Sequence, residues 1–172
     1  MKLVPYSEEF KEINHAWRLE NASALYNPHK QMSVEELNQH NLQGGSDLTR
    51  FREFDRIRLF ALVDGEPVGN CSLRNINLQM LTAELGYLIG EKHYGKGLGT
   101  QMVSLFLQQV FEKSLLRRIE AVINVNNRSS VRLVEKLGFV REGLLREHYL
   151  LNGAPADNYL YSLLKGEFTP VD

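Results

Sequence analysis

The spacing of apolar residues predicts a chain that begins with a short strand and helices and then alternates strands with helices. Segments that alternate apolar and polar residues, or that are apolar throughout and bounded by turn residues, are typical of strands. The predicted strands cover residues 2–5, 57–63, 68–73, 81–89, 118–126, 144–151 and 159–164. One long helix has an apolar stripe formed by Val103, Phe106, Leu107, Val110 and Phe111. The pattern therefore predicts a mixed α/β chain.

Turn residues indicate how these strands are connected. Asp64-Gly65 is a strong hairpin signal, which Glu66-Pro67 is expected to lengthen, and Asn152-Gly153 marks a late hairpin. In contrast, the strand 81–89, the long helix and the strand 118–126 form a crossover, which requires the two strands to be parallel. We therefore expect a mostly antiparallel sheet that contains one parallel pair.

Capping residues mark the ends of the other helices. A helix is predicted over residues 7–20, and a second one begins at Ser33, where Glu36 completes a Ser-x-x-Glu capping box. A short helix near residue 130 is expected to be capped by Ser129 or Ser130. Gly138 would end that helix in a left-handed conformation.

Composition limits the function classes. With 172 residues, of which 43% are hydrophobic, the chain is expected to form a single domain over residues 1–172. Its formal net charge of −1 provides no electrostatic attraction for the phosphates of nucleic acid, so we expect no nucleic-acid partner. Because no segment resembles an export signal or a membrane span, we expect a cytoplasmic protein with no membrane partner. The five histidines show no paired spacing and Cys71 is the single cysteine, so we expect no metal site.

The run from Tyr94 to Thr100 joins a predicted strand to the long helix and carries three glycines. Gly95, Gly97 and Gly99 allow the backbone to turn sharply and to approach a ligand, while the helix start presents unpaired N–H groups. This combination predicts an anion site. The spacing differs from that of a nucleoside-triphosphate loop and from that of the Gly-x-Gly-x-x-Gly dinucleotide motif.

Further motifs accompany this run in a fixed order. They comprise the strand 83–89, Asn127-Arg128-Ser129-Ser130, Glu135-Lys136-Leu137-Gly138-Phe139 and Glu142-Gly143. Together with the glycine run they resemble the GNAT superfamily of acetyl-CoA-dependent N-acetyltransferases, in particular the branch of the ribosomal-protein N-terminal acetyltransferases RimJ and RimL. The resemblance implies the GNAT fold, an α/β (α+β) arrangement in which a mostly antiparallel sheet has a central splayed parallel strand pair and about four flanking helices.

The resemblance also implies acetyl-CoA as cosubstrate. Pantetheine would pair with the strand end at Leu88 and Ile89, and Asn127 would reach a pantetheine amide, its alternative role being that of a turn residue. The pyrophosphate would bind the run Tyr94, Gly95, Lys96, Gly97, Leu98, Gly99 and Thr100. Lys92 and His93, with Lys96, would add positive charge, unless they are solvated loop residues.

Two residues are candidates for proton transfer. Glu84 lies two residues before Gly86 and is the candidate general base, acting directly or through water; its alternative is a carboxylate paired with an arginine. Many GNAT enzymes carry a tyrosine as general acid where this chain has Val134. The RimL type has a serine on this helix, which makes Ser130 the candidate donor to the departing thiolate, the alternatives being a helix cap and a water donor. Glu147 and Tyr149 are reserve candidates.

The expected reaction is direct attack of an amine on acetyl-CoA in a ternary complex, without an acyl-enzyme on Cys71. The resemblance favours the α-amino group of a protein or peptide, which is roughly a tenth neutral at pH 7 and needs less help from a base than lysine does. Acetylation of a polyamine or an aminoglycoside remains an alternative, as does a non-catalytic acyl-CoA sensor. Both a monomer and a homo-oligomer are compatible with the sequence.

Overall fold

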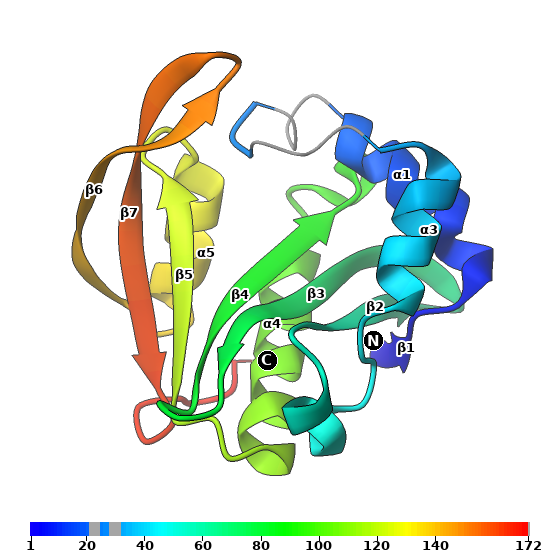
Figure 1. Cartoon of the computed structure of the whole chain (residues 1–172), viewed down its shortest axis with the longest axis horizontal. Helices are drawn as coiled ribbons and strands as arrows, with labels where there is room; N and C mark the ends of the chain where they lie inside the picture. The colour runs from blue at the N-terminus through cyan, green and yellow to red at the C-terminus, as the bar shows by residue number, and fades with distance from the viewer. Residues whose placement is uncertain (21–24, 28–31, 172) are drawn as a thin grey trace.

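The computed structural model describes residues 1–20, 25–27 and 32–171, which form a seven-stranded sheet with helices on both faces (Figure 1). The strands are β1 (Lys2–Pro5), β2 (Ile57–Val63), β3 (Glu66–Asn77), β4 (Thr82–Ile89), β5 (Arg118–Asn124), β6 (Val140–Leu151) and β7 (Ala154–Leu164). The α-helices are α1 (Lys11–Leu19), α3 (Val34–Leu42), α4 (Leu98–Lys113) and α5 (Arg128–Lys136). Short 3-10 helices are η1 (Glu8–Phe10), η2 (Leu48–Glu53) and η3 (Glu91–His93). The predicted mixed fold is confirmed.

The strand order is β1-β2-β3-β4-β5-β7-β6, and only β4 and β5 are parallel among these neighbours. Their pairing is short, because the register ends at Glu84 opposite Glu120. In Figure 1 the two strands lie together at one end of the sheet and diverge toward the other. The predicted splayed parallel pair is therefore present, and the rest of β4 has no β5 partner.

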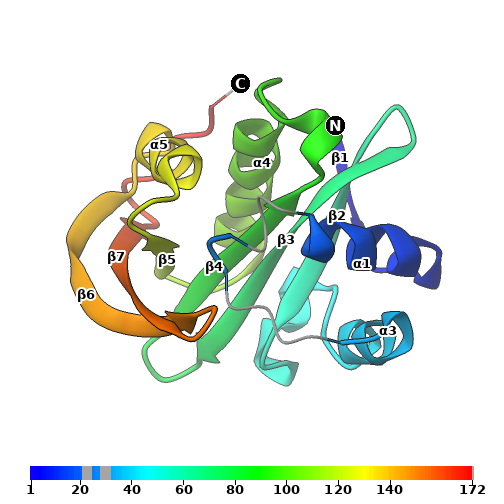
Figure 2. The same ribbon diagram turned by 90° about the horizontal axis from the view of Figure 1, so that it is seen from above.

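Alternating side chains of β2 supply two separate hydrophobic clusters. Leu59 and Ala61 belong to the larger cluster, which α4 covers, whereas Phe60 points to the opposite face. There Phe60 stacks on Phe10 at 4.9 Å between ring centroids and packs against Trp17 of α1. Figure 2 shows α4 and α1 on opposite sides of the sheet. Because each fully buried aromatic or aliphatic side chain contributes about 1.5–3 kcal/mol, both clusters hold the helices that frame the site.

The turns agree with the predicted hairpins except for one length. Asp64 and Gly65 both have positive φ, and Val63 pairs directly with Glu66. The turn therefore has two residues, and the expected lengthening by Glu66-Pro67 is wrong: proline is accommodated because a bulge between Ala61 and Leu62 absorbs the irregularity.

The predicted capping residues are correct for α3 and wrong for α5. Ser33 and Glu36 make both hydrogen bonds of the capping box. At α5 the N-cap is Asn127, whose Oδ1 accepts from the backbone N–H of Ser130 at 3.1 Å. An asparagine oxygen serves as well as a serine hydroxyl at this position, so Asn127 starts the helix earlier and leaves the Ser130 hydroxyl free of the capping role.

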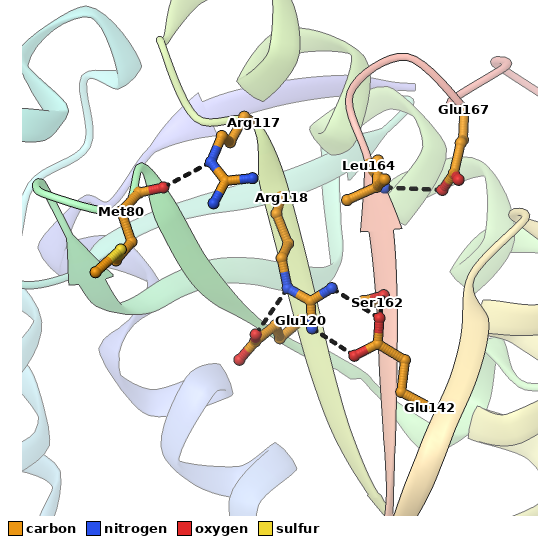
Figure 3. A network of polar contacts seen from close by, with 8 residues as sticks. All are labelled: Met80, Arg117, Arg118, Glu120, Glu142, Ser162, Leu164 and Glu167. Atoms are coloured by element: carbon orange, nitrogen blue, oxygen red, sulfur yellow. Dashed lines mark hydrogen bonds and ion pairs between the residues drawn. The ribbon is translucent and has the colours of Figure 1, made fainter.

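A polar network holds the start of β5, at the closed end of the splayed pair (Figure 3). The Arg118 guanidinium donates to both carboxylate oxygens of Glu142 at 2.8 and 2.6 Å, and its Nε donates to Glu120 at 2.9 Å. Ser162 also donates to Glu142, at 2.6 Å. Arg118 and Ser162 hold the pKa of Glu142 well below its usual value, at about 2. The network ties β5 to β6 and β7, which lie on the side of β5 away from β4.

Candidate active site

A cavity of about 530 Å³ lies where β4 and β5 diverge. The glycine run and the start of α5 form one side of it, and polar residues of α1, β2 and β3 form the other. Every predicted cofactor-binding residue except Lys96 lines this cavity, namely Leu88, Ile89, Tyr94, Gly95, Gly97, Leu98, Gly99, Thr100 and Asn127. The Lys96 side chain instead donates from Nζ to the carbonyl oxygen of Lys92 at 2.9 Å.

The glycine run has the backbone geometry of an anion cradle. Gly95 and Gly97 have φ values of +73° and +75°, and a Cβ placed on either would meet no atom within 4 Å. The first hydrogen bond of α4 runs from the Gln101 N–H to the Gly97 carbonyl, so the N–H groups of Leu98 to Thr100 have no partner within the helix. Positive φ, open space and unpaired donors together fit the pyrophosphate of acetyl-CoA.

The free edge of β4 fits the extended part of the same cosubstrate. Residues 85–89 continue to pair with β3 but have no pairing with β5 in the register of the parallel pair. Main-chain polar groups on this side are therefore available to an extended ligand, as in strand addition. Gly99 brings α4 close to α5, because a Cβ at this position would lie 3.2 Å from Leu133 Cδ1.

Two residues that were not predicted add positive charge near the cradle. Arg132 and Lys136 of α5 line the cavity. Burial lowers the pKa of His93 below its usual 6.5, with smaller effects from Lys92 and Lys96, so this imidazole is neutral at pH 7. Positive charge on His93 is thus disfavoured in the free protein, and the contribution of Lys92 and Lys96 stays a prediction.

Ser130 is hydrogen-bonded to Tyr87, a residue that was not predicted from the sequence. The hydroxyl groups of Tyr87 on β4 and Ser130 on α5 are hydrogen-bonded across the gap, and both residues line the cavity. Burial raises the pKa of Tyr87 above its usual value, so the phenol keeps its proton at neutral pH. When Tyr87 donates to Ser130 Oγ, the serine proton is left to donate to another acceptor in the cavity. The one available signal was a phenol within an otherwise apolar face of the strand.

Neighbouring residues of α5 take structural roles. Val134, at the position where the resemblance led us to look for a tyrosine, is completely buried in the core. Asn127 uses Oδ1 to accept hydrogen bonds from the Ser130 backbone and from Ser129 Oγ at 2.9 Å. Asn127 also lines the cavity, where a pantetheine carbonyl is the predicted partner of its side-chain amide.

Glu84 lies at the point where β4 and β5 part, but its carboxylate is already engaged. Oε1 accepts from Arg74 Nη2 at 2.6 Å and Oε2 accepts from Asn75 Nδ2 at 2.7 Å. The side chain is 12% exposed and does not line the cavity. The arginine pairing that was the alternative for Glu84 is thus present. Glu147 and Tyr149, the reserve candidates, do not line the cavity either.

Cys71 has the environment of a packed thiol. It is completely buried on β3, directly opposite Tyr87 of β4. Burial raises its pKa well above 9, so the thiolate that a nucleophile requires is absent at neutral pH. This environment matches a reaction without a cysteine-bound intermediate.

Comparison with known proteins identifies the family. Residues 1–140 match the acetyltransferase (GNAT) domain family, and the chain therefore belongs to the GNAT acetyltransferases. It is 33% identical over 123 residues to the uncharacterized N-acetyltransferase p20 of Bacillus licheniformis, covering 72% of this chain and 69% of that protein.

Two solved structures share the fold. Spermidine N-acetyltransferase from Vibrio cholerae, in complex with CoA and spermine, superposes with a TM-score of 0.81 at 23% identity, covering 96% of each chain. RimL, a ribosomal L7/L12 α-N-protein acetyltransferase in complex with CoA, has a TM-score of 0.82 at 22% identity and covers 94% of this chain and 92% of its own. These two neighbours are named for different acceptors, so likeness of fold leaves the acceptor open.

The chain is an N-acetyltransferase that uses acetyl-CoA, as its family membership establishes. Within residues 1–20, 25–27 and 32–171, no helix has the length and apolar character needed to cross a membrane. The same residues contain no group of three or more His, Cys, Asp or Glu side chains arranged to hold a metal ion.

Proposed function

We propose that the chain acetylates the α-amino group of a protein or peptide N-terminus. One observation carries this proposal: no Asp or Glu is present among the described residues that line the cavity. A polyamine or an aminoglycoside brings several positive charges, and binding them away from water calls for carboxylate partners. An N-terminal α-amine brings one ammonium group, which is roughly a tenth neutral at pH 7 without any base.

The hydroxyl groups of Tyr87 and Ser130 are suited to donate a proton to the departing thiolate of CoA. Acetyl-CoA, when bound, supplies an activated acetyl thioester. Ser130 Oγ holds a proton within the cavity, and the Tyr87 hydroxyl orients it. Backbone N–H groups near Ile89, on the unpaired edge of β4, are the proposed donors to the carbonyl oxygen. The acetyl group is then transferred directly to the amine.

Glu84 is proposed to accept the amine proton through an intervening water, because its carboxylate does not line the cavity. Glu84→Gln is expected to lower turnover at pH 7 by roughly 10²-fold, the lower end of the range for general base catalysis. The loss should shrink at high pH, where the amine is already neutral. Steady-state rates across neutral and alkaline pH measure this, with Glu112→Gln on the surface of α4 as control. If Glu84→Gln turns over as fast as the wild type at pH 7, Glu84 is not the base, and its role is limited to the ion pair with Arg74.

The acceptor is tested with two peptides that differ at one position and at the N-terminus. The first has a free N-terminus and no lysine, and the second has a blocked N-terminus and one lysine. We expect kcat/KM to be at least about 10-fold higher for the first, because an α-amine is roughly 10²-fold more often neutral than a lysine at pH 7. Thiol release gives the rate and mass spectrometry locates the acetyl group. Equal rates, or a faster reaction with spermidine, would refute the N-terminal assignment, and failure to acetylate any amine would favour a sensor.

A further inference from the structure

The side of the cavity opposite the glycine run carries three arginines, which we call the arginine wall: Arg18, Arg58 and Arg74. Arg58 of β2 lies opposite Ser72 of β3, and Arg74 is two residues further along the same strand, so both project from one face of the sheet. Arg18 belongs to α1, which lies over this face (Figure 2). Three positive groups from three elements therefore border one end of the cavity.

Glu84 neutralises one of these cations, because its carboxylate accepts from Arg74 and also from Asn75. No described acidic residue lines the cavity, so the cavity offers Arg58 no carboxylate. Residues 21–24 and 28–31, which the structure does not describe, contain no Asp or Glu in the sequence. Burial lowers the pKa of Arg58 to about 10, with smaller effects from Arg18, Arg56 and Arg74. Repulsion among these cations would be relieved by a bound anion.

Two buried donor groups at the arginine wall have no hydrogen-bond acceptor among the described residues. Arg58 donates from Nη1 to Asn41 Oδ1, yet its Nε is buried without a hydrogen-bond acceptor among the described residues. Asn14, which is 2% exposed and lines the cavity, accepts from Asn70 Nδ2 at 3.1 Å, while its own Nδ2 has no acceptor within the described chain. Buried donors without acceptors are rare in folded proteins. Both groups are donors only, so an atom that pairs with either must be an oxygen-type acceptor.

The cosubstrate has its own anion site at the other end of the cavity. The glycine run and the α5 residues Arg132 and Lys136 border that end, which leaves the arginine wall for the acceptor. We propose that the acceptor carries a carboxylate or another anionic group close to its amine, and that Arg58, Arg74 and Asn14 bind this group. The inference rests on the proposed function and narrows its acceptor to a protein or peptide N-terminus with an acidic residue close to the amine. A free amino acid presents the same combination of amine and carboxylate, and the test distinguishes the two sources.

Matched acceptors test the proposal on the unmodified enzyme. In one pair of peptides, the only difference is Asp in place of Asn at the first or second position. A second pair compares alanine with alaninamide. Each rate is divided by the fraction of the amine that is neutral, because the amines differ in pKa. In the pair that resembles the natural acceptor, we expect kcat/KM to be about 30-fold higher for the anionic member. A ratio of this size corresponds to one hydrogen bond to a charged group. The Asp pair identifies an acidic peptide, and the alanine pair identifies a free amino acid.

Arg58→Gln provides the second test. This variant should raise KM for the anionic acceptor about 30-fold, bring it to the level of the neutral acceptor and leave acetyl-CoA affinity unchanged. Arg56→Gln is the matched control, because Arg56 lies near Arg58 but does not line the cavity. The control should retain the preference for the anionic acceptor. If Arg58→Gln does not fold, the ratios measured with the wild-type enzyme still decide.

The outcomes separate the two proposals. Acetylation of peptides without any preference for the anionic member would overturn the arginine wall as an anion site and leave the N-terminal function standing. Acetylation of alanine with no reaction of any peptide would support the wall and overturn the peptide acceptor. Spermidine as the best acceptor would overturn both.

Discussion

Ser130→Ala is expected to lower turnover by roughly 10²-fold at pH 7, the usual contribution of a positioned acid. The substitution removes the hydroxyl that borders the cavity and is hydrogen-bonded to Tyr87. Acetyl-CoA affinity should remain nearly unchanged, because the cradle and the edge of β4 are untouched. Stopped-flow detection of the free thiol, together with equilibrium binding of acetyl-CoA, separates turnover from affinity.

The Tyr87 hydroxyl should contribute through Ser130 and not independently. Tyr87→Phe is expected to slow turnover roughly 10-fold, and the double variant should be no slower than Ser130→Ala alone, since groups that act as a unit are not additive. Arg128→Gln is the control, because Arg128 is exposed on α5 and does not line the cavity. Normal turnover in Ser130→Ala would show that water supplies the proton, and additive losses in the double variant would separate the two hydroxyls.

Local signals in the sequence were sufficient for most of the fold. The apolar alternation around Ile119 to Ile123, the turn residues Asn152-Gly153 and the capping box at Ser33 each act over a few neighbouring residues. Such features are largely independent of the rest of the chain, and the structure has all three where they were predicted. The parallel pair followed from the crossover between β4 and β5, which is again a rule of chain order.

Features that depend on contacts distant in sequence were missed. Tyr87 and Ser130 are 43 residues apart, and only the splay of β4 from β5 brings their hydroxyls together. The arginine wall combines α1, β2 and β3, so no single segment of the sequence carries its pattern. Glu84 shows the converse: its position beside the splay was predicted, while its engagement by Arg74 depends on the register of β3 against β4. Asn127 replaced the predicted serine caps because several residues in that segment are able to cap a helix.

The glycine cradle is central to the account, because it is the proposed binding site of the acetyl-CoA pyrophosphate. Thermal unfolding with and without acetyl-CoA tests it in Gly97→Val and in the matched variant Gly65→Val. Both glycines have positive φ, +75° and +87°, and a Cβ added to either would have no other atom within 4 Å, so both variants carry similar backbone strain. Of the two, Gly97 alone borders the cavity.

At a hundredfold excess over Kd, acetyl-CoA should stabilise the wild-type protein by about 2.7 kcal/mol, which corresponds to roughly 5–10 °C in Tm for a chain of this size. Gly65→Val should melt at a lower temperature than the wild type and show the same shift. Gly97→Val should show no Tm shift with acetyl-CoA, because the valine side chain occupies the space in which the ligand would contact the protein backbone. A full shift in Gly97→Val would contradict the placement of acetyl-CoA on the glycine run.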